Sequence, residues 1–134
     1  NVHFDGELVA RQVKMDPAQV FKTLVARGEK RGILVACVPV DCELNCKALA
    51  QAAGEKKVEL VHVAELIALT GYQRGGCSPI GMKKPYPVFI DESALAHDIV
   101  AVSAGTRGCQ LLLAPDALFS YTRAQKARLT KEEE

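Results

Sequence analysis

Residues Val20–Val38 read VFKTLVARGEKRGILVACV, two apolar runs joined by a short polar segment. The first run, Val20–Val25, is rich in β-branched and aromatic side chains, which is typical of a β-strand. The second run, Ile33–Val38, is almost wholly apolar and predicts a buried strand. The polar, glycine-containing segment Arg27–Gly32 predicts a turn, so we expect the two strands to form a hairpin.

The remainder of the chain alternates short helices with short strands. A helix is expected over residues 42–53, with Asp41 as its N-cap and Gly54 at its end. Further helices are expected within residues 1–15, over 64–69 and over 115–129, and a frayed tail over 130–134. Further strands are expected over residues 57–61, 87–91, 99–103 and 109–113. Because strand–strand neighbours outnumber strand–helix–strand units, the sequence predicts a mixed α/β fold rather than a Rossmann fold. The expected architecture is a compact, largely antiparallel sheet or barrel with flanking helices.

The composition is typical of one globular domain spanning residues 1–134, with 49% hydrophobic and 25% charged residues. No apolar run approaches the roughly 20 residues that span a bilayer, so we expect no membrane partner and a cytoplasmic protein. The formal net charge is +1, which excludes indiscriminate tight binding to nucleic acid. An RNA partner would have to be held by a local patch or presented by another protein.

The cysteines and histidines do not indicate a metal site. The five cysteines follow no disulfide spacing, and no histidine lies near Cys42 and Cys46 to complete a familiar zinc pattern. We therefore expect reduced thiols, no metal and no cofactor. A Ser–His–Asp site is not indicated either, because none of the three histidines lies in a recognisable motif.

A glycine-rich segment, Thr70–Lys84, reads TGYQRGGCSPIGMKK and holds four of the ten glycines. Backbone dense in glycine exposes N–H groups, which suits it to bind an anion or to polarise a carbonyl group. The segment is not a P-loop, because Cys77 occupies the lysine position in one register and Met82 follows Gly81 in the other. It is therefore either a long connecting loop or a binding loop of another kind.

Two residues could carry chemistry. Lys22 lies between Val20 and Leu24 on one face of its strand. Its ammonium group either reaches past these neighbours to solvent or points into a pocket, where it would bind a phosphate or a developing negative charge. Cys77 lies among N–H donors, which would lower the pKa of a thiol, so it is either a nucleophile or a small apolar residue lining the loop.

Several separate motifs occur in order over about residues 3–120. They are Phe21-Lys22-Thr23-Leu24, Leu44 with Lys47-Ala48-Leu49-Ala50, Thr70-Gly71-Tyr72 leading to Gly75-Gly76-Cys77-Ser78-Pro79-Ile80-Gly81, and Val102-Ser103-Ala104-Gly105-Thr106-Arg107-Gly108. With these motifs at these spacings, the chain resembles the YbaK/EbsC family, the free-standing relatives of the editing domain inserted in bacterial prolyl-tRNA synthetase.

The resemblance implies a compact mixed-sheet fold and an aminoacyl-tRNA deacylase that removes a wrong amino acid from proline tRNA. In the YbaK branch the substrate is Cys-tRNA(Pro), and the substrate's own thiol attacks its carbonyl, releasing tRNA and leaving a thiolactone. The implied partners are aminoacylated tRNA and prolyl-tRNA synthetase, in a ternary complex. Two alternatives remain open: an Ala-tRNA(Pro) deacylase of the same family, and a non-catalytic adaptor that binds tRNA or the synthetase.

The resemblance also implies the residues of the site. Lys22 matches the family's essential lysine, Ser103 its pocket serine, and Gly75 to Pro79 the Gly-x-x-x-Pro loop whose amides approach the aminoacyl carbonyl. The catalytic set is then Lys22, Gly75, Gly76, Pro79 and Ser103. The substrate-binding set is Phe4, Cys77, Ser78 and Arg107, and the tRNA-binding set is Arg27, Arg31, Arg74, Lys83 and Lys84. A position that is often acidic in the family is occupied by Gln110.

Overall fold

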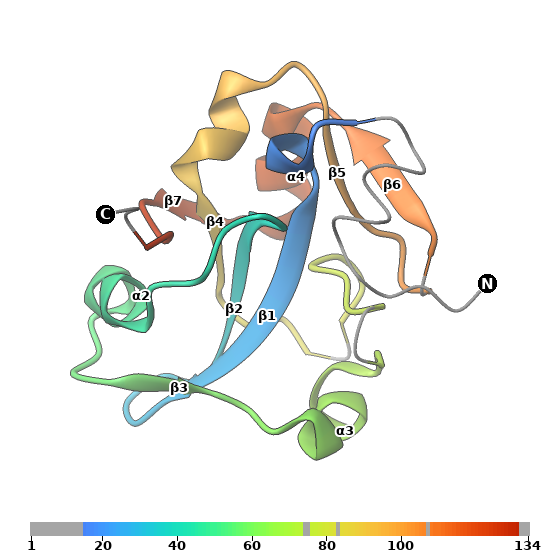
Figure 1. Cartoon of the computed structure of the whole chain (residues 1–134). Coiled ribbons are helices and arrows are strands. Elements are labelled where there is room, and N and C mark those ends of the chain that lie inside the picture. Colours follow the sequence, from blue (N-terminus) through green and yellow to red (C-terminus); the bar gives the residue numbers. More distant parts are fainter. Residues whose placement is uncertain (1–14, 74–75, 83, 107, 132–134) are drawn as a thin grey trace.

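The computed structural model of the chain describes residues 15–73, 76–82, 84–106 and 108–131 (Figure 1). Its elements, in chain order, are η1 (Pro17–Gln19), β1 (Phe21–Gly28), β2 (Gly32–Pro39), α2 (Cys46–Ala53), β3 (Val58–Leu60), η2 (Val63–Glu65), α3 (Leu66–Thr70), β4 (Val88–Asp91), η3 (Glu92–Ala96), β5 (Val100–Ser103), β6 (Gln110–Leu113), α4 (Pro115–Thr122) and β7 (Gln125–Ala127). Within the described residues no helix is long and apolar enough to cross a membrane.

Two sheets organise these elements. The larger has five strands in the order β3-β1-β2-β4-β7, and β5 and β6 form a separate two-stranded sheet. β2 pairs in parallel with β4, as β4 does with β7, whereas the β1–β2, β1–β3 and β5–β6 pairs are antiparallel. The predicted mixed α/β fold with a largely antiparallel sheet is therefore confirmed.

The predicted hairpin of β1 and β2 is confirmed, but its turn is shorter than expected. Arg27 and Gly28 pair with Ile33 and Gly32, so they belong to the strands and only residues 29–31 make the turn. The buried carboxylate of Glu55 accepts hydrogen bonds from the backbone N–H groups of Lys30 and Arg31. The same hydrogen bonds hold the pKa of Glu55 below its usual value. This carboxylate therefore fixes the turn, which lies far from it in the sequence.

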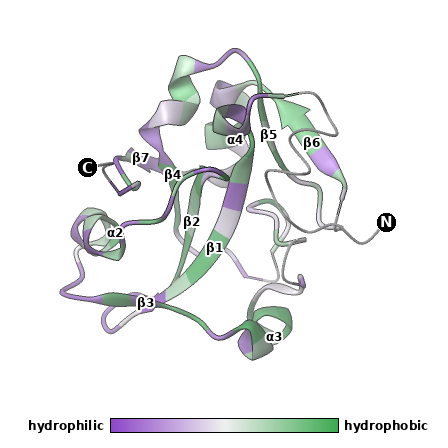
Figure 2. Ribbon diagram, viewed as in Figure 1, coloured by the Kyte–Doolittle hydropathy of each residue, from purple (hydrophilic) through white to green (hydrophobic). Residues whose placement is uncertain are grey.

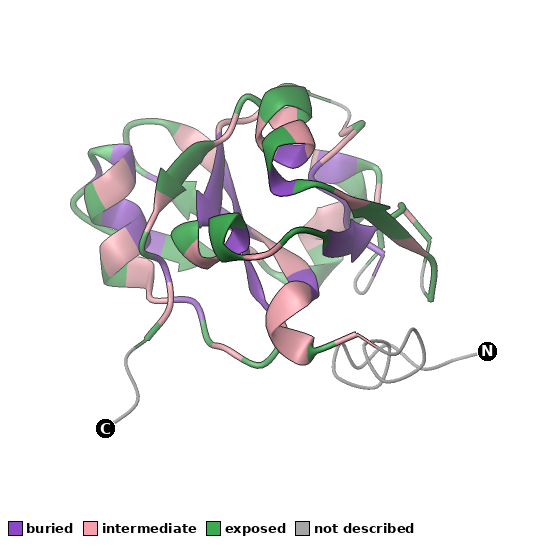
Figure 3. Cartoon of the chain, turned by 90° about the horizontal axis from the view of Figure 1, so that it is seen from above, coloured by how far each residue is buried: buried purple, intermediate pink, exposed green. Residues whose placement is uncertain are grey.

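Hydrophobic cores lie on both faces of the five-stranded sheet. Figure 2 shows the hydrophobic residues along β2, the central strand of this sheet. One core joins the sheet to α2 and the C-terminal segment and includes Ala36, Leu49 and Leu129. The other joins the sheet to β5 and α4 and includes Cys37 and Leu118. Because successive strand residues point to opposite faces, β2 carries buried side chains toward both cores, which explains its nearly continuous apolar sequence. Figure 3 shows the buried residues gathered in these central strands.

The helix predicted over residues 42–53 begins later than expected. It starts at Cys46, and its N-cap is Asn45 rather than Asp41. The side-chain oxygen of Asn45 accepts hydrogen bonds from Lys47 N and Ala48 N, as an N-cap does. The residue before it, Leu44, is buried and forms a β-bridge with Thr130, so the segment ahead of the helix is extended. The predicted end at Gly54 is confirmed, since this residue adopts the left-handed conformation.

The helix predicted over residues 115–129 is wrong in its second half. α4 ends at Thr122, and the chain then forms β7, which pairs with β4. Beyond β7, the N–H of Leu129 donates a hydrogen bond of 2.8 Å to the buried carboxylate of Asp91. At the start of the predicted frayed tail, Thr130 forms a β-bridge with Leu44 and Lys131 forms an ion pair with Glu43. Residues 132–134, and the helix expected within 1–15 except for Met15, lie outside the described residues.

Candidate active site

Lys22 lies near the start of β1, opposite Val38 of β2. Strand alternation places it on the same face as Leu24, whereas the hydroxyl of Thr23 lies on the other face, 3.7 Å from the thiol of Cys37. The Lys22 side chain is half-buried and makes no hydrogen bond or ion pair with any residue that the structure describes. Its ammonium group is therefore available to an anion.

The separate hairpin of β5 and β6 lies beside the start of β1 (Figure 1). Val20, just before β1, and Ala101 of β5 form a parallel bridge. Two residues further along each segment come Lys22 and Ser103. Because alternate strand residues share a face, Lys22 and Ser103 lie on the same face as Val20 and Ala101. The structure therefore brings the predicted lysine and the predicted serine to one place.

Ser103 is paired in register with Gln110 of β6, so their side chains share a face. The hydroxyl of Ser103, in a buried residue, accepts a hydrogen bond of 3.1 Å from the N–H of Gly105. The side-chain oxygen of Gln110 is buried and has no hydrogen-bond partner within the described part of the chain. An unpaired buried acceptor is costly, and it points to a ligand that supplies a donor. The family resemblance marks position 110 only as one that is often acidic, and it implies no role for Gln110 itself.

The glycine-rich loop is buried from Gly76 to Pro79. The N–H of Gly76 donates to the carbonyl of Gln73 at 3.0 Å, and so it closes a turn within the loop. The N–H groups of Cys77 and Ser78 donate no hydrogen bond to any described residue. Within the described residues of the loop, these two adjacent donors can polarise a carbonyl group.

Tyr72 links this loop to the β5–β6 hairpin. Its hydroxyl donates a hydrogen bond of 2.6 Å to the carbonyl of Ile80. Its ring lies against the turn that follows Ser103, since a Cβ atom on Gly105 would lie 3.0 Å from ring carbon Cε1. Tyr72 therefore holds the loop next to the end of β5, where Ser103 lies. Lys22 makes no hydrogen bond or ion pair with the described loop residues. Within the described part of the chain, the loop is therefore linked to the region of Lys22 through Tyr72 and the end of β5.

The sequence of the chain matches a known family. The sequence model of the aminoacyl-tRNA editing domain matches residues 4–121. The chain belongs to this family. The resemblance seen in the sequence is thereby confirmed.

Two curated relatives and one solved structure show how close the similarity is. The editing domain is 48% identical over 131 residues to EbsC of Enterococcus faecalis, named as a candidate Cys-tRNA(Pro)/Cys-tRNA(Cys) deacylase; the match covers 98% of this chain and 80% of the relative. It is 32% identical over 72 residues to a proline–tRNA ligase of Brachyspira hyodysenteriae, over 54% of this chain and 12% of the ligase. The crystal structure of a candidate trans-editing enzyme for prolyl-tRNA synthetase superimposes with a TM-score of 0.87 at 28% identity, covering 95% and 80% of the two chains.

Cys77 of the editing domain lies in an environment unlike that of a nucleophile. Its side chain is only 6% exposed. Burial raises the pKa of its thiol to about 11, against a smaller lowering effect of the hydrogen bond with Thr70. The expected lowering of this pKa by the loop N–H groups is therefore wrong. At neutral pH the thiol is protonated and weakly nucleophilic.

We predict that Cys77→Ser retains deacylase activity within about threefold of the unchanged protein, because the reaction does not use this sulfur. The measurement is the initial rate of deacylation of charged proline tRNA at saturating substrate. Cys42→Ser, at a half-buried cysteine outside the loop, is the matched control. A Cys77→Ser protein that is folded but inactive would restore the cysteine nucleophile.

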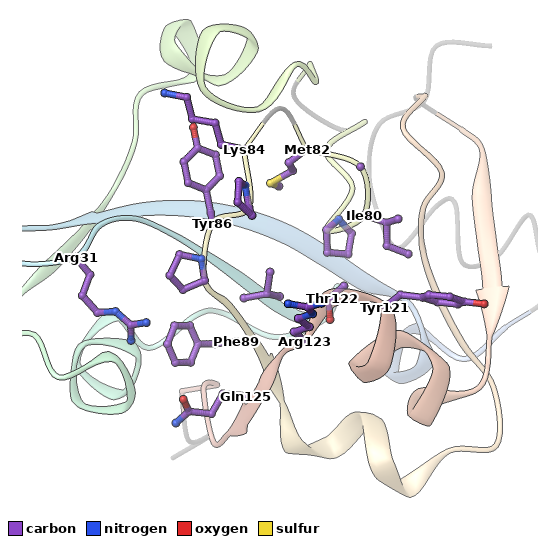
Figure 4. Close-up of a pocket in the computed structure, with 15 residues that line it drawn as sticks. Arg31, Ile80, Met82, Lys84, Tyr86, Phe89, Tyr121, Thr122, Arg123 and Gln125 are labelled. Atoms are coloured by element: carbon purple, nitrogen blue, oxygen red, sulfur yellow. The ribbon is translucent and has the colours of Figure 1, made fainter.

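The remaining predicted residues are distributed as follows. Phe4, Arg74, Gly75, Lys83 and Arg107 lie outside the described residues. Arg27 forms an ion pair of 2.8 Å with Glu65. Arg31 and Lys84 line an open groove of about 640 Å³ that adjoins the loop at Pro79 (Figure 4). Among the described residues, no three or more histidine, cysteine or acidic side chains are grouped as a metal site would require.

Proposed function

We propose that this editing domain is a trans-acting deacylase that clears Cys-tRNA(Pro), with Lys22 at the centre of its site. The observation that carries the proposal is Lys22, a half-buried residue whose ammonium group has no ion pair or hydrogen bond among the described residues and whose strand runs beside that of Ser103. An ammonium group without a protein partner is free to bind an anion such as a phosphate. The relative named as a candidate Cys-tRNA(Pro)/Cys-tRNA(Cys) deacylase supports the choice of substrate.

The proposed reaction uses the thiol of the substrate cysteine as nucleophile. Its sulfur attacks the carbonyl carbon of the same residue, so a sulfur–carbon bond forms and the ester carbon–oxygen bond breaks. The terminal ribose oxygen leaves and takes the proton that the thiol gives up. The products are free tRNA and a thiolactone, which water then opens to cysteine. Because an ester already has a good leaving group, the protein needs to supply only position and charge stabilisation.

Each part of the site then has a task. The N–H groups of Cys77 and Ser78 donate to the carbonyl oxygen as negative charge develops on it. Lys22 binds a phosphate at the terminal adenosine end of the tRNA. Ser103 lies between Lys22 and Gln110 and donates its hydroxyl proton to the substrate, since its oxygen already accepts from Gly105.

We further propose that Gln110 accepts a hydrogen bond from the α-ammonium group of the aminoacyl moiety. Its side-chain oxygen is buried and unpaired among the described residues, and an ammonium group is a strong donor for it. We predict that Gln110→Leu raises KM for the charged tRNA by about tenfold, while the free energy of unfolding does not fall, because an unsatisfied buried acceptor is removed. Thermal unfolding and steady-state kinetics check this, with Gln110→Glu as the variant that keeps the acceptor. An unchanged KM in the leucine variant would exclude the contact.

The net charge of +1 favours a partner that presents the tRNA. A near-neutral protein binds RNA weakly and with strong salt dependence. We propose that prolyl-tRNA synthetase supplies tRNA identity in a ternary complex, which leaves the editing domain to read the aminoacyl end. Tight selectivity of the isolated domain for proline tRNA would contradict this division of tasks.

The experiment that tests the proposal compares proline tRNA charged with cysteine and with S-methylcysteine. The methyl group blocks the thiol and adds only one carbon. We expect rapid cleavage of the cysteine ester, and at least about 100-fold slower cleavage of the blocked ester because no sulfur nucleophile remains. Equal rates would show that water or a protein group attacks the carbonyl, and the mechanism would be wrong.

A further inference from the structure

The open groove beside the loop is lined by cations, and Glu55, which accepts a hydrogen bond from the N–H of Arg31, lies outside its described lining. Its described lining includes three cations, Arg31, Lys84 and Arg123, and no aspartate or glutamate. All three side chains belong to exposed residues. In a protein whose net charge is only +1, this groove concentrates positive potential at one place.

Two features of the lining, the contacts of Arg31 and the backbone conformation of Arg123, show that these arginines are held in defined positions. The guanidinium group of Arg31 lies 5.8 Å from the ring centre of the buried Phe89, and it donates to the carbonyl of Ala53. Arg123 has φ of 54°, and it is the one residue other than glycine with positive φ among the described residues. A left-handed conformation costs a side-chain-bearing residue roughly 1–2 kcal/mol. An arginine at such a position therefore suggests a use for its charge.

Aromatic side chains accompany the cations. Tyr121, two residues before Arg123, is 74% exposed, the highest exposure among the large hydrophobic residues that the structure describes. Figure 4 shows Arg31 at one end of the groove, Tyr121 at the other, and Arg123 between them. Cations that follow a backbone together with an exposed aromatic ring are the features that bind single-stranded nucleic acid.

The position of the groove indicates which part of an RNA it would bind. Pro79 belongs both to the groove lining and to the loop with the free N–H groups. A strand whose aminoacylated end lies at that loop would therefore continue into the groove. We propose that the groove binds the single-stranded 3′ segment of the tRNA, with Arg31, Lys84 and Arg123 on its phosphates and Tyr121 stacked on a base. This inference rests on the proposed function and assigns a role to Arg123 and Tyr121, which no sequence motif indicates.

The test is the salt dependence of binding of uncharged proline tRNA, measured by fluorescence anisotropy. The double variant Lys84→Gln/Arg123→Gly removes two cations, so its slope of log affinity against log salt should be shallower by roughly 1.4–1.8. Its affinity near 100 mM salt should fall about tenfold. The matched control Lys56→Gln/Lys57→Gln removes two exposed cations outside the groove lining and should change neither quantity. Equal binding by all three proteins, or equal weakening by both variants, would overturn the proposal.

Two further measurements separate this role from folding and from the proposed function. Arg123→Gly alone should not lower the melting temperature, because glycine adopts positive φ without strain, yet it should weaken tRNA binding about threefold. A tRNA that lacks its single-stranded 3′ end should bind the unchanged protein no better than it binds the double variant, because the segment that contacts the groove is gone.

If the variants lost binding to the synthetase but kept binding to tRNA, the groove would fit an acidic protein surface, and the proposal would be wrong. The cysteine ester of adenosine 5′-monophosphate, which keeps the phosphate assigned to Lys22, should be cleaved equally by the double variant and the unchanged protein. Absence of cleavage by both would contradict the proposed function while leaving the tRNA-binding result intact.

Discussion

Replacing Lys22 by alanine is expected to lower kcat/KM for deacylation of Cys-charged proline tRNA by at least about 100-fold. The reason is that, among the described residues of the candidate site, Lys22 is a cation whose side chain makes no hydrogen bond or ion pair. Loss of the charge-assisted contact between this ammonium group and the tRNA phosphate weakens substrate binding, and it therefore lowers kcat/KM. The measurement is steady-state deacylation at low and at saturating substrate, which separates KM from kcat.

The Lys22→Ala protein should remain folded. The side chain is half-buried and makes no ion pair in the described structure, so its truncation should change the free energy of unfolding by less than about 1 kcal/mol. Lys22→Met keeps the aliphatic stem without the charge and should be as inactive as the alanine variant. Lys56→Ala, at an exposed lysine, removes the same charge and should be fully active. Activity retained by a folded Lys22→Met protein would show that this charge is not used.

Tyr72→Ala is expected to lower kcat by roughly 10- to 100-fold and to destabilise the protein by about 2–3 kcal/mol. The substitution removes a hydrogen bond of 2.6 Å to Ile80 and a half-buried ring that lies against Gly105. The loop would then lose its connection to the end of β5, and small misplacements of reacting groups are costly. Because Tyr72 acts by positioning the loop, KM should change less than kcat.

Tyr72→Phe distinguishes this positioning role from a chemical one. The phenylalanine ring keeps the contact with Gly105 and loses only the hydrogen bond, so it should recover most of the activity at a cost of about 1 kcal/mol in stability. Equal loss of activity in both variants would indicate that the hydroxyl itself takes part in the reaction. Full activity of the folded alanine variant would show that the loop is held in place without Tyr72.

The central hairpin could be predicted because its pattern is local. β-Branched residues, a polar turn and period-two alternation define both strands of residues 20–38, and alternation already placed Lys22 apart from Thr23. The end of the helix at Gly54 was predictable for the same reason, since glycine there takes the left-handed conformation. In each case the residues that determine the structure are neighbours in the sequence.

Features that depend on distant contacts could not be read from the sequence. β7, Gln125–Ala127, has no strand-like pattern and exists because it pairs with β4, some 36 residues earlier. The choice of Asn45 over Asp41 as N-cap follows from the bridge between Leu44 and Thr130, which the local sequence does not show. Propensity is overridden in both places by tertiary pairing.

The same limit applies to the site. The family motifs identified Lys22, the glycine loop and Ser103, but not the residues that connect them. Tyr72 joins the loop to the turn after β5, and Gln110 lies opposite Ser103 only because of the register of β5 and β6. The raised pKa of Cys77 likewise comes from burial, which the glycine-rich sequence around it did not indicate.

The most direct test of the function is a side-by-side deacylation assay of proline tRNA charged with cysteine, with alanine and with proline. The protein acts in trans on each substrate at equal concentration, and Lys22→Ala provides the blank for spontaneous hydrolysis. We expect Cys-tRNA(Pro) to be cleaved at least 100-fold faster than the other two, because only cysteine carries the thiol that attacks its own ester. Preferential cleavage of Ala-tRNA(Pro) would instead identify an alanine deacylase of the same family, and cleavage of none of the three would contradict the enzyme and favour an adaptor.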